Sequence, residues 1–272
     1  MVKVVNTLMG AASKESRKEV RKKLGTLKSL TVQEKTKERY KLGLTGFFDF
    51  LRAEGLKLPT KRDAMDGLVS DYLEYMWSQG EGRAAASTFM AALQDYDPKL
   101  KSNLPGSWRL MKTWSTHELP SRASPMTEAV LRAMVGWAVM HDYETFGLSL
   151  LVGFYGLLRT GELLALQAWQ IHMNSALQPA VINLGFTKGG KRQGAAESVT
   201  ITEKHVLSHL WAWKCRVPQH TFLTLKPHAW RSLFSECIQK LKLEGREFRP
   251  YSLRRGGRLI SSSNVVVWIQ YY

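Results

Sequence analysis

The chain has 272 residues, enough for one large domain or two ordinary ones, and 44% of them are hydrophobic, the share of a globular rather than a disordered protein. Lys and Arg number 39 against 23 Asp and Glu, so the formal charge is +16, an excess that attracts polyanions over long range. We find no apolar run of about 18 residues and no leader pattern, so the sequence favours nucleic acid over a membrane as the partner and gives no sign of secretion.

The two cysteines indicate the compartment. Cys215 and Cys237 have no CxxC or His neighbour at metal-ligand spacing. We therefore expect reduced thiols in an intracellular protein, nuclear in a eukaryote and cytoplasmic in a bacterium. A structural zinc is not expected, and neither is any other cofactor.

Residues 1–30 form a basic N-terminal arm, dense in Lys and Arg and poor in large apolar side chains. Such a composition is typical of a solvated arm or of a helix on a negatively charged surface. A simple solubilising tail explains it equally well.

The next part of the chain, residues 31–118, has apolar side chains at helical spacing. This pattern predicts a domain of three or four amphipathic helices. Each helical stretch ends at a Gly, Pro or Asp-rich turn; the stretches are 31–55, 61–80 and 82–100. Pro120 and Pro125 then interrupt the pattern, so a linker is expected at 119–126.

The second half, residues 127–272, mixes helices with a short sheet. Thr127 can cap a helix whose apolar side chains run from Val130 to Ala138. Two β-branched runs around a Gly-rich basic tip predict a hairpin at 180–201. Helical periodicity occupies the remaining stretches: 144–158, 202–215, 227–243 and a late helix opened by the basic cluster at 249–257. The sequence therefore predicts a mainly α fold with a small β-hairpin or sheet.

Arg159 lies between two apolar runs, in "GLLRTGELLAL" at 156–166. By itself it is explained by a structural ion pair with Glu162, three residues on. A basic hairpin tip with Lys188 and the cluster "RPYSLRRGG" follow it in the chain. Two forked guanidinium groups and a lysine are suited to clamping a phosphate whose charge grows in a phosphoryl-transfer transition state.

The order of these three pieces resembles the catalytic domain of the tyrosine recombinases, also called the phage integrase family, over roughly residues 124–257. The resemblance implies a helical core-binding domain that contacts DNA at 31–118. It also implies a mixed α+β catalytic domain at 127–272, incomplete at its C-terminus. Double-stranded DNA is the implied partner, and a tetramer on DNA is implied if the C-terminus were complete.

The resemblance also assigns roles by position. Arg159 and Arg254 resemble the two catalytic arginines, and Glu162 would support the first of them. Lys188 resembles the hairpin lysine that protonates the leaving 5′ hydroxyl, with Lys191 as a nearby alternative. The remaining basic residues of these motifs are expected to contact DNA: Lys191, Arg192 and Arg255, the last with a structural role as its alternative.

Two departures from the family pattern bear on activity. Tyr251 occupies the position where the family has histidine or lysine, and as a catalytic residue its phenol would donate a hydrogen bond to a phosphate oxygen. With an ordinary pKa near 10 a phenol is a poor proton shuttle at neutral pH, so activity is expected to survive in reduced form. The family also needs on the order of 30 residues after its second arginine to reach the nucleophilic tyrosine, whereas 18 residues follow Arg254 here. Tyr271 or Tyr272, after Trp268, would be the nucleophile of a compressed segment.

Two functions therefore remain open. The first is DNA recombination and integration, by strand cleavage and rejoining through a 3′-phosphotyrosine intermediate that needs neither ATP nor a metal. The second is DNA binding without catalysis by a truncated remnant of a mobile element that lacks the nucleophile.

Overall fold

The computed structural model describes residues 13–119, 121–185, 187, 196–216, 222–223 and 225–264; the side chains of residues 62, 63 and 260–264 are outside this description. The chain divides into two compact units, Met1–Pro120 and Ser121–Tyr272. None of the helices in this described part is long and apolar enough to cross a membrane.

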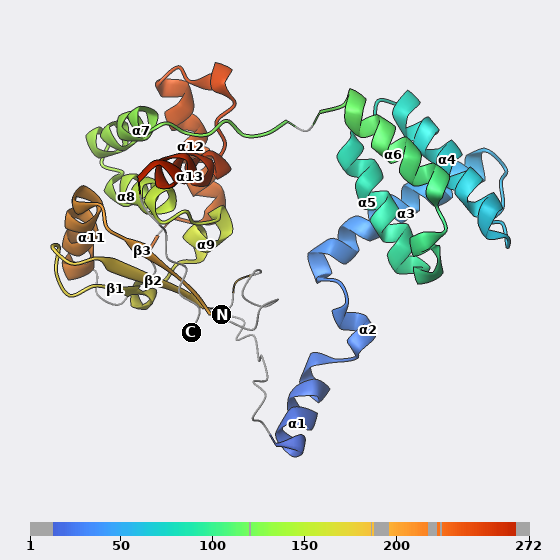
Figure 1. Cartoon of the computed structure of the whole chain (residues 1–272), viewed down its shortest axis with the longest axis horizontal. Coiled ribbons are helices and arrows are strands. Elements are labelled where there is room, and N and C mark those ends of the chain that lie inside the picture. Colours follow the sequence, from blue (N-terminus) through green and yellow to red (C-terminus); the bar gives the residue numbers. More distant parts are fainter. Residues whose placement is uncertain are drawn as a thin grey trace. The chain divides into compact units, whose positions relative to one another are not determined.

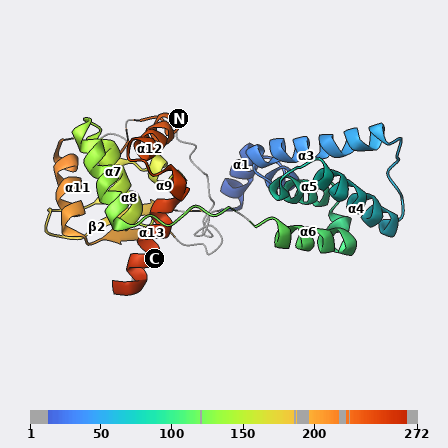
Figure 2. The ribbon, with the colours of Figure 1, turned by 90° about the horizontal axis from the view of Figure 1, so that it is seen from above.

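The described residues of the first unit form helices joined by turns and loops, with no strand among them. Its aromatic centre consists of Phe47, Tyr72 and Phe89, whose rings lie 4.7–5.1 Å apart. In Figure 2, α4 and α5 lie between α3 and α6. The elements are α1 (Lys14–Leu24), α2 (Leu27–Leu30), α3 (Glu34–Ala53), α4 (Arg62–Ser78), α5 (Arg83–Tyr96), the 3-10 turn η1 (Pro98–Ser102) and α6 (Pro105–His117).

A single carboxylate joins α4 to the start of α6. Asp66 accepts hydrogen bonds from the backbone N–H groups of Gly106 and Ser107, at 2.7 and 2.9 Å, and from the Ser107 hydroxyl at 2.7 Å. Burial raises the pKa of Asp66, but the hydrogen bonds from Ser107 and Gly106 outweigh it, so this pKa lies below its usual value. Asp66 thus satisfies N–H groups that a helix N-terminus leaves without an intrahelical partner.

Helix α1 carries the basic N-terminal sequence. It begins after Ser13, whose hydroxyl accepts a hydrogen bond from the backbone N–H of Ser16 at 3.2 Å, and it has basic residues throughout its last turn. None of its residues is buried. The sequence of this stretch therefore forms a solvent-exposed cationic helix.

The second unit is a helical cluster with one small sheet, which confirms the predicted fold class. Figure 1 shows the helices gathered around α8 with the sheet beside α11. The helices are α7 (Glu128–Met140), α8 (Glu144–Tyr155), α9 (Thr160–Ala165), α11 (Lys204–Arg216), α12 (Pro227–Lys240) and α13 (Tyr251–Asn264), with 3-10 turns η2 (Ala168–Gln170) and η3 (Glu244–Arg246). The strands are β1 (Ile171–His172), β2 (Ala180–Gly185) and β3 (Glu197–Ile201).

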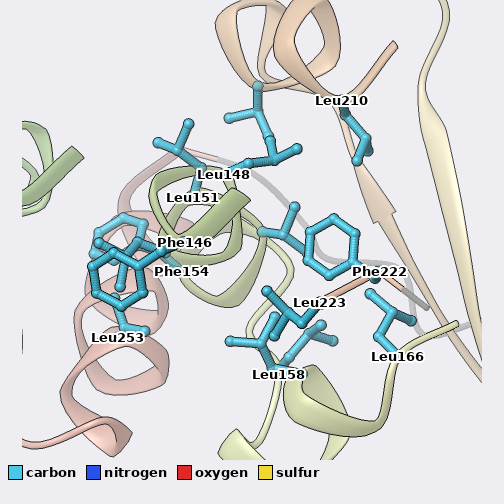
Figure 3. Packing of buried hydrophobic residues seen from close by; sticks show 14 of the residues in the cluster. Phe146, Leu148, Leu151, Phe154, Leu158, Leu166, Leu210, Phe222, Leu223 and Leu253 are labelled. Carbon is cyan, nitrogen blue, oxygen red and sulfur yellow. The ribbon is translucent and has the colours of Figure 1, made fainter. Parts of the chain in front are cut away.

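Helix α8 is the centre of this unit because its side chains are apolar on every face. All residues from Phe146 to Phe154 are buried, as expected for a helix without a polar side. Figure 3 shows Phe154 close to Leu253 of α13 and, on another side of α8, Phe222 near Leu166. The helix that precedes Arg159 is therefore held from several directions.

The three strands form one antiparallel sheet in the order β1-β2-β3. Strands β2 and β3 pair as the predicted hairpin, with Ala180 opposite Ile201, and residues 186 and 188–195 between them lie outside the described residues. The register shifts between Asn183 and Gly185, where Gly185 adopts a φ of 62°. Such a bulge suits glycine, which has no Cβ to oppose positive φ.

The two cysteines are free thiols, one exposed and one buried. Burial raises the pKa of Cys237 to about 12, so this thiol is uncharged at neutral pH. Cys215 is the exposed one. Within the described ranges, no group of three or more His, Cys, Asp or Glu residues is placed to hold a metal ion.

Candidate functional site

The turn that follows α8 places Arg159 at the surface of the second unit. The chain leaves α8 through Leu157, which has a left-handed φ of 50°. Arg159 is then extended and is the last residue before α9. Its side chain is 44% exposed, so the apolar runs around it in the sequence do not bury the guanidinium. Among the described residues, the ion pairs of this guanidinium both use Nη1, so its Nε and Nη2 groups can donate to a ligand.

The Glu162 carboxylate joins two arginines that are far apart in the sequence. One oxygen accepts the Arg159 guanidinium at 2.5 Å, and the other accepts the Arg159 backbone N–H at 2.7 Å. This second oxygen also lies 3.7 Å from Nη1 of Arg254 on α13. Glu162 therefore fixes the start of α9 and brings two guanidinium groups onto one carboxylate.

The Arg254 guanidinium is the more buried of the two, with its side chain 14% exposed. Burial lowers the pKa of Arg254, and the positive charges of Arg159 and Arg258 lower it further. The ordinary pKa of arginine is so high that the group stays cationic at neutral pH. In contrast, the hydrogen bond that the Arg159 guanidinium donates to Glu162 raises the pKa of Arg159. The two positive charges are thus held close together at the Glu162 carboxylate.

A second carboxylate, that of Glu197, faces the same arginine from the sheet. Its Oε2 lies 4.0 Å from Nη1 of Arg159 and accepts the hydroxyl of Thr187 at 2.5 Å. Sequence reasoning did not identify Glu197, which lies at the start of β3. The sequence signal that could have identified it is an acidic residue at the start of the strand that follows the basic hairpin tip.

Tyr251 lies on the same helix as Arg254, one turn before it, and is 47% exposed. It acts electrostatically on both Arg159 and Arg254. The phenol is therefore within electrostatic range of the two guanidinium groups.

Two consecutive glycines allow α13 to approach the rest of the unit closely. A Cβ at Gly256 would overlap the Met126 carbonyl oxygen, and one at Gly257 would overlap the Phe154 carbonyl oxygen at the end of α8. Because any side chain here would push the helix away, "RRGG" is the sequence that places Arg254 next to α8 and α9.

The remaining residues singled out from the sequence fall into two groups. The guanidinium of Arg255 donates a hydrogen bond to the backbone carbonyl of Ala123. The others lie outside the described residues: Lys188, Lys191, Arg192, Trp268, Tyr271 and Tyr272.

Among known proteins, this chain is similar to solved structures but matches no family model and no curated sequence. Among solved structures, the chain is similar to the XerH site-specific recombinase bound to difH substrate in a pre-cleavage complex, with 14% identity, a TM-score of 0.60, and coverage of 93% of this chain and 75% of that chain. It is also similar to XerH bound to palindromic difH substrate in a post-cleavage complex, with 14% identity, a TM-score of 0.58, and coverage of 84% and 69%.

At this identity the likeness shows the fold. The chain has the fold of a site-specific recombinase, as the three sequence motifs predict.

Proposed function

We propose that this chain is a DNA-binding protein of the tyrosine recombinase type that cleaves and rejoins DNA strands. The observation that carries the proposal is the convergence of Arg159 and Arg254 on Glu162. These are the two arginines that the sequence motifs single out, and in this recombinase-like fold one immediately precedes α9 while the other lies in α13. Two forked, permanently charged donors suit the non-bridging oxygens of a backbone phosphate.

In the proposed reaction a tyrosine hydroxyl gives up its proton to water, its oxygen forms a bond to the phosphorus, and the bond from phosphorus to the 5′ oxygen breaks. Arg159 and Arg254 stabilise the charge that grows on the phosphate oxygens during this step. The departing 5′ oxygen takes a proton, which we assign to Lys188 or alternatively Lys191, and Tyr271 is the proposed nucleophile. The 3′-phosphotyrosine link conserves the bond energy, and a 5′ hydroxyl reverses the step in rejoining.

The charge and the two-unit architecture support DNA as the partner. The net charge of +16 attracts a polyanion, and the similar solved structures are described as XerH bound to difH substrate. We assign residues 31–118 as a core-binding domain and 127–272 as the catalytic domain. Sites on DNA are expected to be occupied mainly through backbone contacts, which carry no base code.

A second candidate, DNA binding without cleavage, is favoured by Tyr251. The family places histidine or lysine there, whereas a phenol beside Arg159 and Arg254 transfers protons poorly at neutral pH. Both candidates share the phosphate-binding arginines. They differ in whether a covalent intermediate forms.

The test starts from duplexes that the full chain selects from a random pool, since its target sequence is unknown. A nick is placed next to the cleavage position of a selected duplex, so that the short cleaved fragment diffuses away. Because rejoining is then prevented, any covalent protein–DNA adduct accumulates. The proposal expects an adduct with the wild-type chain, a loss of at least 100-fold in its rate of formation with Arg159→Ala or Arg254→Ala, and near-normal rates with Arg231→Ala. The control residue is an exposed arginine on α12 that donates to a carbonyl of its own helix.

Binding without any adduct would favour the second candidate. Failure to select any duplex would contradict both candidates.

A further inference from the structure

Residues 121–126 lie against the beginning of the helix that carries Arg254. The backbone N–H of Met126 donates to the carbonyl of Ser252 at 3.1 Å. Three residues earlier, the carbonyl of Ala123 accepts the guanidinium of Arg255. Both Ala123 and Met126 are buried. The 121–126 segment is therefore attached at two points to the first turns of α13.

The outer end of the segment is attached as well. The guanidinium of Arg249 donates a hydrogen bond to the Ser121 hydroxyl at 2.8 Å. The Ser121 hydroxyl in turn donates to the Glu247 carboxylate at 3.4 Å. The backbone N–H of Arg249 in turn donates to the hydroxyl of Ser252, which is fully buried. These hydrogen bonds also connect the start of the 121–126 segment to the residues that precede α13.

Gly256 makes the approach of the two backbones possible. Any Cβ at this position would overlap the carbonyl group of Met126. The 121–126 segment and α13 therefore meet at Gly256 with backbone against backbone.

Arg254 and Arg255 are neighbours that serve different sides of α13. Successive residues of an α-helix point about 100° apart. Arg254 lies 3.7 Å from Glu162, whereas Arg255 contacts the carbonyl of Ala123. Arg255 thus contacts a backbone carbonyl of its own chain. Its position in the sequence is equally compatible with a contact to a DNA phosphate.

We propose that Arg255 is a positioning residue: by fixing the first turns of α13 to the 121–126 segment, it holds Arg254 at Glu162, and it does not contact DNA. This inference rests on the proposed function insofar as Arg254 binds a phosphate. A charged donor to a buried carbonyl is a strong hydrogen bond, and it acts one residue away from the group that it positions.

The test compares Arg255→Met and Arg255→Lys with the wild-type chain and with Arg231→Met as the matched control. Adduct formation is measured at saturating selected duplex, and binding is measured as a function of salt. The positioning role predicts that Arg255→Met slows adduct formation about tenfold, because Arg254 is no longer held at Glu162. Arg254 keeps its charge and its place on α13, so the dissociation constant and its salt dependence are expected to stay close to those of the wild type. The Lys variant keeps a cationic donor and is expected to restore most of the rate.

A phosphate contact gives a different result. Arg255→Met would then weaken binding and reduce the slope of log affinity against log salt by about one unit, and this outcome would overturn the proposal. An unchanged rate in Arg255→Met would overturn it too.

A measurement without DNA separates this inference from the proposed function. Hydrogen–deuterium exchange of a peptide spanning residues 121–126 reports the protection of the Met126 N–H in the free protein. Exchange should become at least several-fold faster in Arg255→Met, with no change in Arg231→Met and recovery in Arg255→Lys. Unchanged exchange would contradict the inference, whereas a wild-type chain that binds no duplex would contradict the proposed function alone.

Discussion

The guanidinium groups of Arg159 and Arg254 are both directed to the carboxylate of Glu162, at 2.5 and 3.7 Å on its two oxygens. One arginine precedes α9 and the other lies in α13. A carboxylate between two arginines holds their like charges together before any phosphate arrives. The protein thereby has a preorganised pair of cations, one half-exposed and one largely buried.

Replacing Glu162 by Gln should destabilise the second unit. Gln keeps an acceptor for the Arg159 N–H but leaves Arg254, whose side chain is 14% exposed, without its nearest negative charge. A largely buried cation that loses its partner costs on the order of 1–3 kcal/mol of unfolding free energy. Urea unfolding, followed through the second unit, measures the loss, with Glu144→Gln as control because the Glu144–Arg216 pair is exposed. Equal stabilities of the two variants would contradict the role given to Glu162.

Replacing glycine by alanine is expected to change stability in opposite directions at Gly256 and at the control position Gly136. Gly256→Ala places a Cβ into the Met126 carbonyl, so we expect more than about 2 kcal/mol of destabilisation, since backbone must move. Gly136 lies in α7 with open space around its Cβ position. Gly136→Ala should therefore stabilise the helix by about 0.5–1 kcal/mol. Thermal unfolding of both variants checks the pair, and a Gly256→Ala variant as stable as wild type would show that α13 does not approach this closely.

The lowered pKa of Asp66 implies that the folding stability of the first unit decreases in acid. Its pKa is lowered in the folded state, so its contribution to stability is complete above its unfolded-state pKa, about 4, and is lost as the pH falls through the lower folded-state value. Asp66→Ala removes the acceptor for Gly106 and Ser107 and should cost about 1 kcal/mol at pH 7. The difference between wild type and variant should shrink below pH 4. A constant difference down to pH 2 would contradict the assignment.

Tyr251→His tests whether the phenol limits catalysis. Imidazole has an ordinary pKa near 6.5, so it exchanges protons at neutral pH far more readily than a phenol does. If the chain forms an adduct, we expect Tyr251→His to raise the rate several-fold and to add a pH dependence between about 6 and 7. Tyr251→Phe serves as the control that keeps the ring without its hydroxyl. A slower His variant would mean that the phenol hydrogen-bonds the phosphate in a way that imidazole does not reproduce.

The features that the sequence predicts well are those with a local signature. The apolar run at 144–158 specifies α8, and Thr127 accepts the backbone N–H of Val130 at the start of α7 as a capping residue should. The β-branched runs at 180–201 specify β2 and β3. Strand β1 has only two residues, too few for any periodicity, and it was missed.

The features that the sequence does not reveal depend on distant backbone. Helix α6 was not located individually, and its N-terminus is satisfied by Asp66 of α4. The partner of Arg255 is a main-chain carbonyl at Ala123, and an acceptor of this kind exists at every residue. Glu197 approaches Arg159 only because β3 pairs with β2. In each case the tertiary fold, rather than the local sequence, selects the partner.

The salt dependence of duplex binding tests the central claim, that Arg159 and Arg254 bind a DNA phosphate, most directly. Each lost phosphate contact removes about 0.9 from the slope of log affinity against log salt. We predict a steep negative slope for wild type, a slope shallower by about one unit for Arg159→Ala and for Arg254→Ala, and no change for Arg231→Ala. Identical slopes for wild type and both site variants would mean that the two arginines serve only as structural partners of Glu162.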